Sequence, residues 1–378
     1  MVGQQDSSSN GPSLAEIGYG TAAEALMGIR YNTSPPGPTF VPSLDAALLH
    51  LRPHLGSSSL RRGDLMEIVG TSGSGKSSLI TFLILITILS ATLPAPLSTN
   101  LGGKEAQAML FQPNTHRPIL PLIRRAMEAH IKACAPGVED DVVNSVIKDS
   151  MSRLRIWTGK LRWKDLALGI QSVLDETSPY TFPLSNSGHA LDLLAIDGLS
   201  DAYYPKRWSE EEHGRRQQPH LTGKAVEMED IGLRQVMEAI GAVRKELGSV
   251  VVMSVQSLRV SRDAQPFHLP HLPPPYPSPF ASSNNLPLSA SNPMYWPLNI
   301  QLSLMGRSRG LQLPGDTMIA DALRVKARER NDKAEDTRGD TYNGLVRMVR
   351  SDGVLLGKEG IGFHFRVGNE GLQAWGDE

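Results

Sequence analysis

The chain is poor in cysteine and has no excess of charge of either sign. Cys134 is the single cysteine among 378 residues, so no internal disulfide can form. This favours a reducing compartment, cytosol or nucleus, over a disulfide-stapled secreted domain. The 38 basic and 39 acidic residues leave a formal net charge of −1. Without a global basic field, any contact with nucleic acid must come from local clusters.

Long hydrophobic runs are also missing. The longest apolar stretch, 79–89, is too short to cross a bilayer. Residues 1–10 are polar and do not resemble a charged start followed by an apolar run. We therefore expect neither a targeting leader nor a membrane anchor, and we interpret residues 79–89 as a helix buried on most sides.

What the chain does contain is one complete phosphate-binding loop pattern, G-x-x-x-x-G-K-[ST]. The pattern comprises Gly70, Thr71, Ser72, Gly73, Ser74, Gly75, Lys76 and Ser77, and Ser78 follows it. It lies between an apolar strand predicted at 65–69 and a helix predicted at 77–89, so that backbone N–H groups can curl around a phosphate. Lys76 is expected to reach the β- and γ-phosphates of ATP, and the Ser77 hydroxyl to bind Mg²⁺. The alternative is a Gly/Ser-rich turn without a ligand.

Strands and helices alternate along the chain. Apolar strands are predicted at 106–111, 154–157, 191–196, 249–255, 298–304, 345–349 and 362–367, and helices at 43–51, 118–132, 142–151, 161–175 and 231–247. Ser43 is expected to cap the first of these helices. Strands that are apolar along their whole length indicate a parallel sheet covered on both faces. We therefore predict an α/β fold in which helices sandwich a mostly parallel sheet with closing C-terminal strands.

Composition divides the chain into four parts. Residues 1–42 are predicted to be a disordered N-terminus, a linker arm and a Pro-rich hinge, and residues 43–260 the folded core. Residues 261–297 are a Pro-rich insertion, and 298–378 supply the last strands of the same core. A densely charged insertion at 316–341 interrupts these strands.

Two polar residues end apolar strands of the predicted sheet. Asp197 follows the run 193–196, which places its carboxylate at the C-terminal edge of a strand, beside the phosphate loop. A carboxylate that helps to hold Mg²⁺ belongs at this position, although an aspartate there can also merely cap a turn. Gln256 ends the next strand, and it is either a sensor of the γ-phosphate or simply a polar residue at a strand end.

Together these segments resemble the ATPase core of RecA-type strand-exchange recombinases. The resemblance rests on the order of the phosphate loop, of DGLSDAYY at 197–204 and of VVVMSVQ at 250–256. The approach RRGDLMEIVG at 61–70 is similar to that of the eukaryotic paralogs of the recombinase. The resemblance covers about residues 40–260 and resumes at the final strands.

This resemblance implies a RecA-like P-loop core with ATP and Mg²⁺ as ligands. It also implies other RecA-like paralog subunits and DNA as partners, in a heteromeric DNA-bound complex. The implied role is double-strand-break repair by homologous recombination, with a nuclear location.

One departure from the family concerns hydrolysis. The family's second core strand delivers an acidic residue that orients the attacking water, and the resemblance places Asn114 there with Gln112 as its neighbour. Neither amide can accept a proton at neutral pH. The resemblance thus implies ATP binding with weak or no hydrolysis, unless another carboxylate such as Glu105 serves.

An N-terminal segment is a candidate for contacts with a partner subunit. The run Tyr19-Gly20-Thr21-Ala22 resembles the aromatic-x-x-Ala arm with which family members dock on a neighbouring subunit. Tyr19 would fill a pocket on that subunit, and Ala22 would pack behind it. The alternative is an arm whose aromatic side chain covers its own domain.

The loops after Asp197 and Gln256 take the places of the family's two DNA-contacting loops. Their candidate DNA contacts are Lys206, Arg207, Arg215, Arg216, Arg259 and Arg262. Glutamates at 210–212 lie among the first four, so a solvated loop of mixed charge is the competing interpretation. The second loop runs into the Pro-rich stretch, which also suits a spacer or adaptor-binding segment.

Two other classes of protein are compatible with the phosphate loop. A P-loop small-molecule kinase or other phosphotransferase would need a lid whose arginines neutralise the transferred phosphoryl group. Arg207, Arg215 and Arg216 are candidates for that role. A non-catalytic scaffold would instead retain the loop only for packing.

Overall fold

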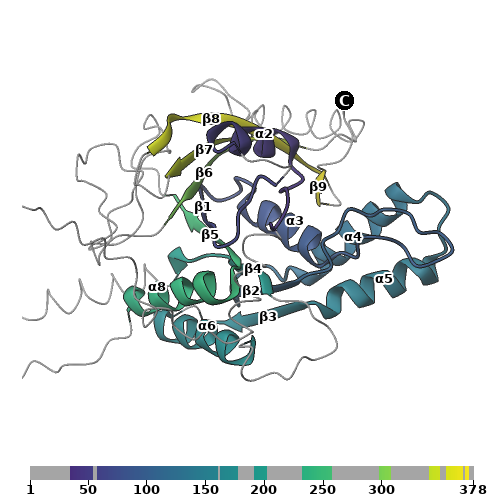
Figure 1. Cartoon of the computed structure of the whole chain (residues 1–378), viewed down its shortest axis with the longest axis horizontal. Helices are drawn as coiled ribbons and strands as arrows, with labels where there is room; N and C mark the ends of the chain where they lie inside the picture. Colours follow the sequence, from purple (N-terminus) through teal and green to yellow (C-terminus); the bar gives the residue numbers. More distant parts are fainter. Residues whose placement is uncertain are drawn as a thin grey trace, which may run out of the picture.

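The computed structural model describes residues 35–53, 58–160, 162–177, 191–201, 232–257, 298–307, 340–349, 355–368 and 371–373. These stretches form one sheet with helices packed against it (Figure 1). The prediction of an α/β fold with a mostly parallel sheet flanked by helices is confirmed.

The described strands pair in a nine-stranded sheet of order β3-β2-β4-β5-β1-β6-β7-β8-β9. Their bounds are β1 Leu65–Gly70, β2 Gln107–Pro113, β3 Leu154–Gly159, β4 Leu191–Ile196, β5 Val250–Gln256, β6 Ile300–Arg307, β7 Asp340–Val349, β8 Leu355–Gly368 and β9 Gly371–Gln373. Strands from β3 to β6 in this order are parallel, and β7, β8 and β9 continue the sheet antiparallel. The C-terminal ends of β1, β2, β4 and β5 therefore meet at one edge.

Helices cover both faces of the sheet. One face packs against α2 (Pro42–Leu51), α3 (Lys76–Ile88), α4 (Leu120–Cys134) and α5 (Asp140–Ser152). The other packs against α6 (Trp163–Thr177) and α8 (Leu233–Ala242), which continues into a π-helical turn, η2 (Val243–Leu247). Figure 1 shows α6 and α8 together, apart from α3 and α4. The parallel strands β1, β4 and β5 are mostly apolar because both faces of the sheet are covered, and each carries a single polar residue in its interior.

Successive residues of the strands feed two separate hydrophobic cores. In β1, Met66 and Ile68 join the core beneath α3, whereas Leu65 joins the core beneath α6 and α8. Every residue of α3 from 79 to 88 is buried, as the sequence predicts for this stretch. This burial fixes the helix that directly follows the phosphate loop.

Several predicted boundaries differ from the structure. The prediction that Ser43 caps α2 is wrong, because Pro42 occupies the first turn, Val41 is the N-cap and Ser43 Oγ instead donates to the carbonyl of His364. Strand β2 runs on to Pro113 rather than ending at 111. Strand β7 begins at Asp340, inside the range assigned to the charged insertion, and β9 was not predicted at all.

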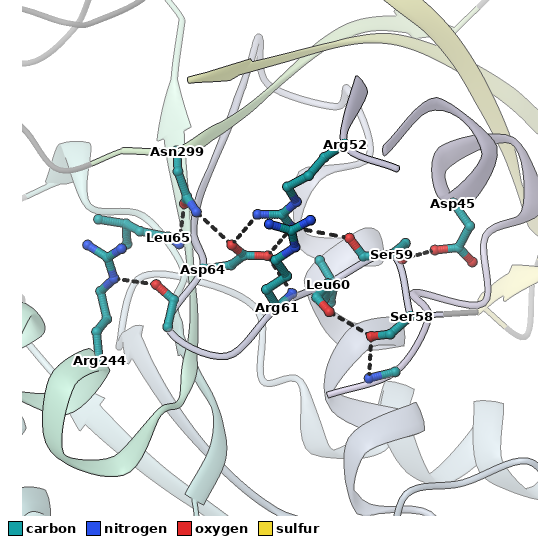
Figure 2. A network of polar contacts seen from close by, with 12 residues as sticks. Asp45, Arg52, Ser58, Ser59, Leu60, Arg61, Asp64, Leu65, Arg244 and Asn299 are labelled. Carbon is teal, nitrogen blue, oxygen red and sulfur yellow. Dashed lines mark hydrogen bonds and ion pairs between the residues drawn. The ribbon is translucent and has the colours of Figure 1, made fainter. Parts of the chain in front are cut away.

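The turn that leads into β1 is fixed by a polar network (Figure 2). The buried Asp64 carboxylate accepts two hydrogen bonds from Arg52, at 2.8 and 2.6 Å, and one of 2.6 Å from Asn299 Nδ2. Asn299 Oδ1 in turn accepts from the backbone N–H of Leu65 at 2.6 Å, and Arg244 donates to the Gly63 carbonyl at 2.6 Å. The strand that carries the phosphate loop is thus tied at its start to the ends of α2 and η2 and to the segment that enters β6.

A buried carboxylate lies in the middle of β1. Glu67 is 3% exposed and accepts a hydrogen bond of 2.7 Å from Gln301 of β6, whose own amide oxygen accepts from Arg347 of β7. The three residues are register partners across adjacent strands. Burial raises the pKa of Glu67 to about 7, against the opposing effects of the Gln301 hydrogen bond and the Arg347 charge.

Glu67→Gln is expected to remove a pH dependence of stability. Because the folded-state pKa is raised from 4.5 to about 7, the fold binds this proton more tightly than the unfolded chain. The free energy of unfolding therefore falls by about 3 kcal/mol as pH rises through that window. Urea unfolding at pH 5 and pH 8 should show that Glu67→Gln loses less free energy of unfolding between these two pH values than the wild type does. Glu128→Gln, at a half-exposed position of α4, is the control. A wild-type pH dependence in Glu67→Gln would contradict the assignment.

Candidate nucleotide-binding site

The sequence-predicted site residues at the ends of β1, β4 and β5 come together at one edge of the sheet. Gly70 is the last residue of β1, and its register partner in β5 is Gln256. Asp197 directly follows β4, which pairs with β5 on the side away from β1. The loop 71–75 connects β1 to α3 at this edge. The structure thus brings the phosphate loop, Asp197 and Gln256 into one neighbourhood.

The loop has a backbone that only glycine adopts without strain at two positions. Gly73 has φ +74° and Gly75 has φ +90°, both in the left-handed region. A Cβ atom added at Gly75 would lie 3.1 Å from both Phe365 and Tyr342, whose rings stack at a centroid distance of 5.4 Å. These rings belong to β8 and β7, so the C-terminal strands pack against the phosphate loop.

The loop and the first turn of α3 suit an anion. The N-terminus of α3 has no side-chain cap, which leaves its first N–H groups without a side-chain acceptor. Ser74 is 1% exposed, and its Oγ is the buried polar side-chain atom that has no hydrogen-bond partner within the described part of the chain. A Cβ at Gly70 would lie 2.3 Å from that oxygen. Unpartnered polar groups around a glycine-built curl fit a phosphate.

Lys76 lies folded over the loop. Its Nζ donates to the carbonyls of Gly70 and Thr71, at 2.9 and 2.8 Å. Burial lowers the pKa of Lys76, while the nearby carboxylates of Asp197 and Asp201 act in the opposite direction. The ammonium is therefore held against the loop by two of its carbonyls, where the charges of both carboxylates act on it.

The Ser77 hydroxyl and the Asp197 carboxylate are in direct contact. Ser77 Oγ lies 3.0 Å from Asp197 Oδ2 and 3.3 Å from Oδ1, and Ser254 Oγ donates to Oδ1 at 2.6 Å. Burial alone would raise the pKa of Asp197, but hydrogen bonds from His116, Ser254 and Ser77 outweigh it and hold the pKa below its ordinary value. The carboxylate is thus ionised beside a hydroxyl, which is a donor set that fits Mg²⁺ together with phosphate oxygens.

His116 is a member of the site that the sequence did not reveal. Its Nδ1 lies 3.2 Å from Asp197 Oδ2, and its Nε2 lies 3.3 Å from Asp201 Oδ2. Hydrogen bonds to Asp197 and Asp201 raise the pKa of His116 to about 10. Gly198 has φ +92°, and a Cβ there would lie 2.8 Å from the imidazole, so glycine is required for this approach. Gly198 is the one feature of the local sequence that could have indicated this close contact.

Asn114, which the sequence resemblance predicts to stand in place of a catalytic acid, is exposed. Asn114 lies one residue beyond β2, and its backbone N–H donates to the Gly159 carbonyl at 2.9 Å. Its predicted neighbour Gln112 is buried and donates to the Arg117 carbonyl at 3.1 Å, so it holds the turn. Glu105 precedes β2 at the opposite edge of the sheet and accepts from the Ala91 N–H. Glu105 is therefore not placed to substitute for a catalytic acid at the phosphate loop.

The exposed side chain of Gln256 lies at the predicted edge. Its backbone N–H bonds to Ser200 Oγ at 3.1 Å, and the N–H of Ser257 donates to the Gly70 carbonyl at 2.9 Å. The remaining candidates lie outside the described residues. These are the arm residues Tyr19 and Ala22 and the loop residues Lys206, Arg207, Arg215, Arg216, Arg259 and Arg262.

Comparisons with protein-family models and with curated proteins identify no relative of the chain. No protein-family model matches the chain, and a search of curated proteins finds no significant match. Within the described stretches, no group of three or more His, Cys, Asp or Glu side chains is arranged to hold a metal ion. The helices of the same stretches include none that is long and apolar enough to cross a membrane.

Proposed function

We propose that the protein binds ATP with Mg²⁺ at the loop 70–78. The observation that carries this proposal is the contact of 3.0 Å between Ser77 Oγ, in the first turn of α3, and Asp197 Oδ2, at the end of β4. A hydroxyl and an ionised carboxylate at this place hold the magnesium ion of P-loop nucleotide-binding proteins. The backbone curl, the unpartnered Ser74 hydroxyl and Lys76 supply the phosphate contacts.

We further propose that the protein is a RecA-like recombinase paralog that acts in double-strand-break repair by homologous recombination. The support is the order of sequence segments, together with a sheet that extends past β5 through β1 and β6 into antiparallel strands. A small-molecule kinase does not require that extension. The segment 197–204 is especially similar to the short paralog called the second X-ray-repair cross-complementing protein. Other RecA-like paralog subunits and DNA are the proposed partners, and the nucleus the proposed location.

Weak or absent hydrolysis is part of this proposal. Asn114 provides an amide where the family has a carboxylate, and an amide cannot accept a proton from water. The described residues around it offer Asp197 and Asp201, both engaged by His116. We therefore assign the site to nucleotide binding within an assembly rather than to rapid turnover.

Gly75→Ala tests the binding site, with Gly73→Ala as the matched control. Both positions have positive φ, so both variants carry a similar backbone strain of about 1 to 2 kcal/mol. A Cβ at Gly75 also meets the rings of Phe365 and Tyr342 at 3.1 Å, whereas a Cβ at Gly73 meets nothing within 4 Å. Affinity for a fluorescent ATP analogue with Mg²⁺ should fall at least about tenfold more in Gly75→Ala.

Thermal unfolding of both variants shows whether the fold is retained. Equal affinities of the wild type and Gly75→Ala would contradict a phosphate site at this loop. Failure of the wild type to bind the analogue at any Mg²⁺ concentration would identify the loop as a packing element, in which Lys76 serves only the carbonyls of Gly70 and Thr71.

A further inference from the structure

The position of His116 bears on how the site takes up its metal. Asp197 Oδ2 accepts from Ser77 at 3.0 Å and from His116 at 3.2 Å, while Oδ1 accepts from Ser254 at 2.6 Å. An ionised carboxylate has about four acceptor positions. Ser77 Oγ also lies 3.3 Å from Oδ1, so the three partners together approach all of these positions. A water held by the magnesium ion of a bound nucleotide would therefore have to displace one of them.

His116 is the partner that can move. Ser254 is 1% exposed, and its Oγ also accepts from the Gly198 N–H at 2.8 Å, so it is fixed in the sheet. Ser77 lies in the first turn of α3, whose following residues are buried. The His116 side chain is 31% exposed, and it lies on a turn rather than on a strand or helix.

A second carboxylate is available to receive the imidazole. Asp201 Oδ2 lies 3.3 Å from His116 Nε2, and its side chain is 33% exposed. Gly198 lies beneath the ring and leaves the space for it, since a Cβ there would approach the His116 Cε1 to 2.8 Å. The imidazole can therefore leave Asp197 without losing both of its acceptors.

We propose that His116 and the magnesium shell of a bound nucleotide compete for Asp197, so that loading with Mg²⁺–ATP shifts the imidazole to Asp201 alone. This inference rests on the proposed ATP binding. His116 is a positioning residue in this scheme, because it acts through Asp197. Its turn is closed by a hydrogen bond of 3.1 Å from its own N–H to the Pro113 carbonyl.

The test is a Mg²⁺ titration of ATP-analogue binding to the full chain. His116→Ala removes the competitor, so half-maximal binding should require about three- to tenfold less Mg²⁺ than in the wild type, as expected for one exchanged hydrogen bond. His116→Gln keeps a donor for one carboxylate only, so its Mg²⁺ requirement should lie between those of His116→Ala and the wild type. His364→Ala removes an exposed imidazole on β8 and should match the wild type.

Thermal unfolding separates this role from a merely structural one. His116→Ala should be less stable than the wild type without ligand, and the difference should shrink with saturating Mg²⁺–ATP. The same Mg²⁺ requirement in His116→Ala and wild type, or an unchanged stability difference, would overturn the inference while leaving ATP binding intact. A wild type that binds no ATP analogue would overturn the proposed function itself, and the inference with it.

Discussion

Lys76→Ala is expected to lower the affinity for Mg²⁺–ATP at least about 100-fold, equivalent to about 2.8 kcal/mol. The ammonium lies at the mouth of the loop, where it now donates to the carbonyls of Gly70 and Thr71. It can exchange these neutral acceptors for phosphate oxygens, whose negative charge adds a coulombic attraction to the hydrogen bonds of the ammonium. Alanine removes the charge and all three donors together.

Equilibrium titration with a fluorescent ATP analogue measures this loss. Lys132→Ala is the matched control, because it removes an exposed lysine of α4 that pairs with Glu128 and Asp140 instead of approaching the loop. Thermal unfolding of both variants shows whether the fold survives. An unchanged affinity in Lys76→Ala, with the fold intact, would rule out the loop as the phosphate site.

The central strands and the loop were predictable because their physical signals are local. β1, β4 and β5 are largely buried on both faces, so they occur in the sequence as mostly apolar runs, each interrupted by one polar residue. The phosphate loop is contiguous, and two of its glycines, Gly73 and Gly75, occupy positions where the backbone has positive φ. Asp197 could be placed because a residue that follows a parallel strand lies at the C-terminal edge of the sheet.

The closing strands were less predictable because glycines interrupt their pattern. Gly357 and Gly360 have positive φ, and the sequence predicted a strand only from 362 onward in this part of the chain. In the structure both lie within β8, at a shift of register opposite 346–348 of β7. Pairing along β7 maintains the strand through this bulge, and that pairing has no signal in the sequence of β8 itself.

His116 could not be found from spacing alone. It lies 81 positions before Asp197, and the two meet because β2 and β4 pair side by side and a tight turn follows Pro113. Residue type does not distinguish this histidine from one that is merely exposed. The Asp64 network is of the same kind, since Asn299 and Arg244 come from parts of the chain that are distant from the turn before β1.

Asn114 offers the sharpest test of the proposed weak hydrolysis. The side chain is exposed one residue beyond β2, and the backbone there is fixed by the hydrogen bond to Gly159. His116, two residues further along the same turn, contacts Asp197 at 3.2 Å. The turn therefore lies at the edge of the sheet that carries the proposed nucleotide site, and this is where we expect a longer acidic side chain at 114 to act.

Asn114→Glu is accordingly expected to raise the rate of ATP hydrolysis by about 100-fold or more, the contribution typical of a positioned general base. Phosphate release at saturating Mg²⁺–ATP measures the rate. Asn114→Gln has the same length without the charge and should remain at the wild-type rate. Thr115→Glu has the same charge one position away and should also remain slow, because a base must lie within hydrogen-bond reach of the attacking water.

If Asn114→Glu binds ATP normally and is no faster than Asn114→Gln, the missing carboxylate is not the reason for slow turnover. A rate in Thr115→Glu equal to that of Asn114→Glu would attribute the gain to added charge rather than to position.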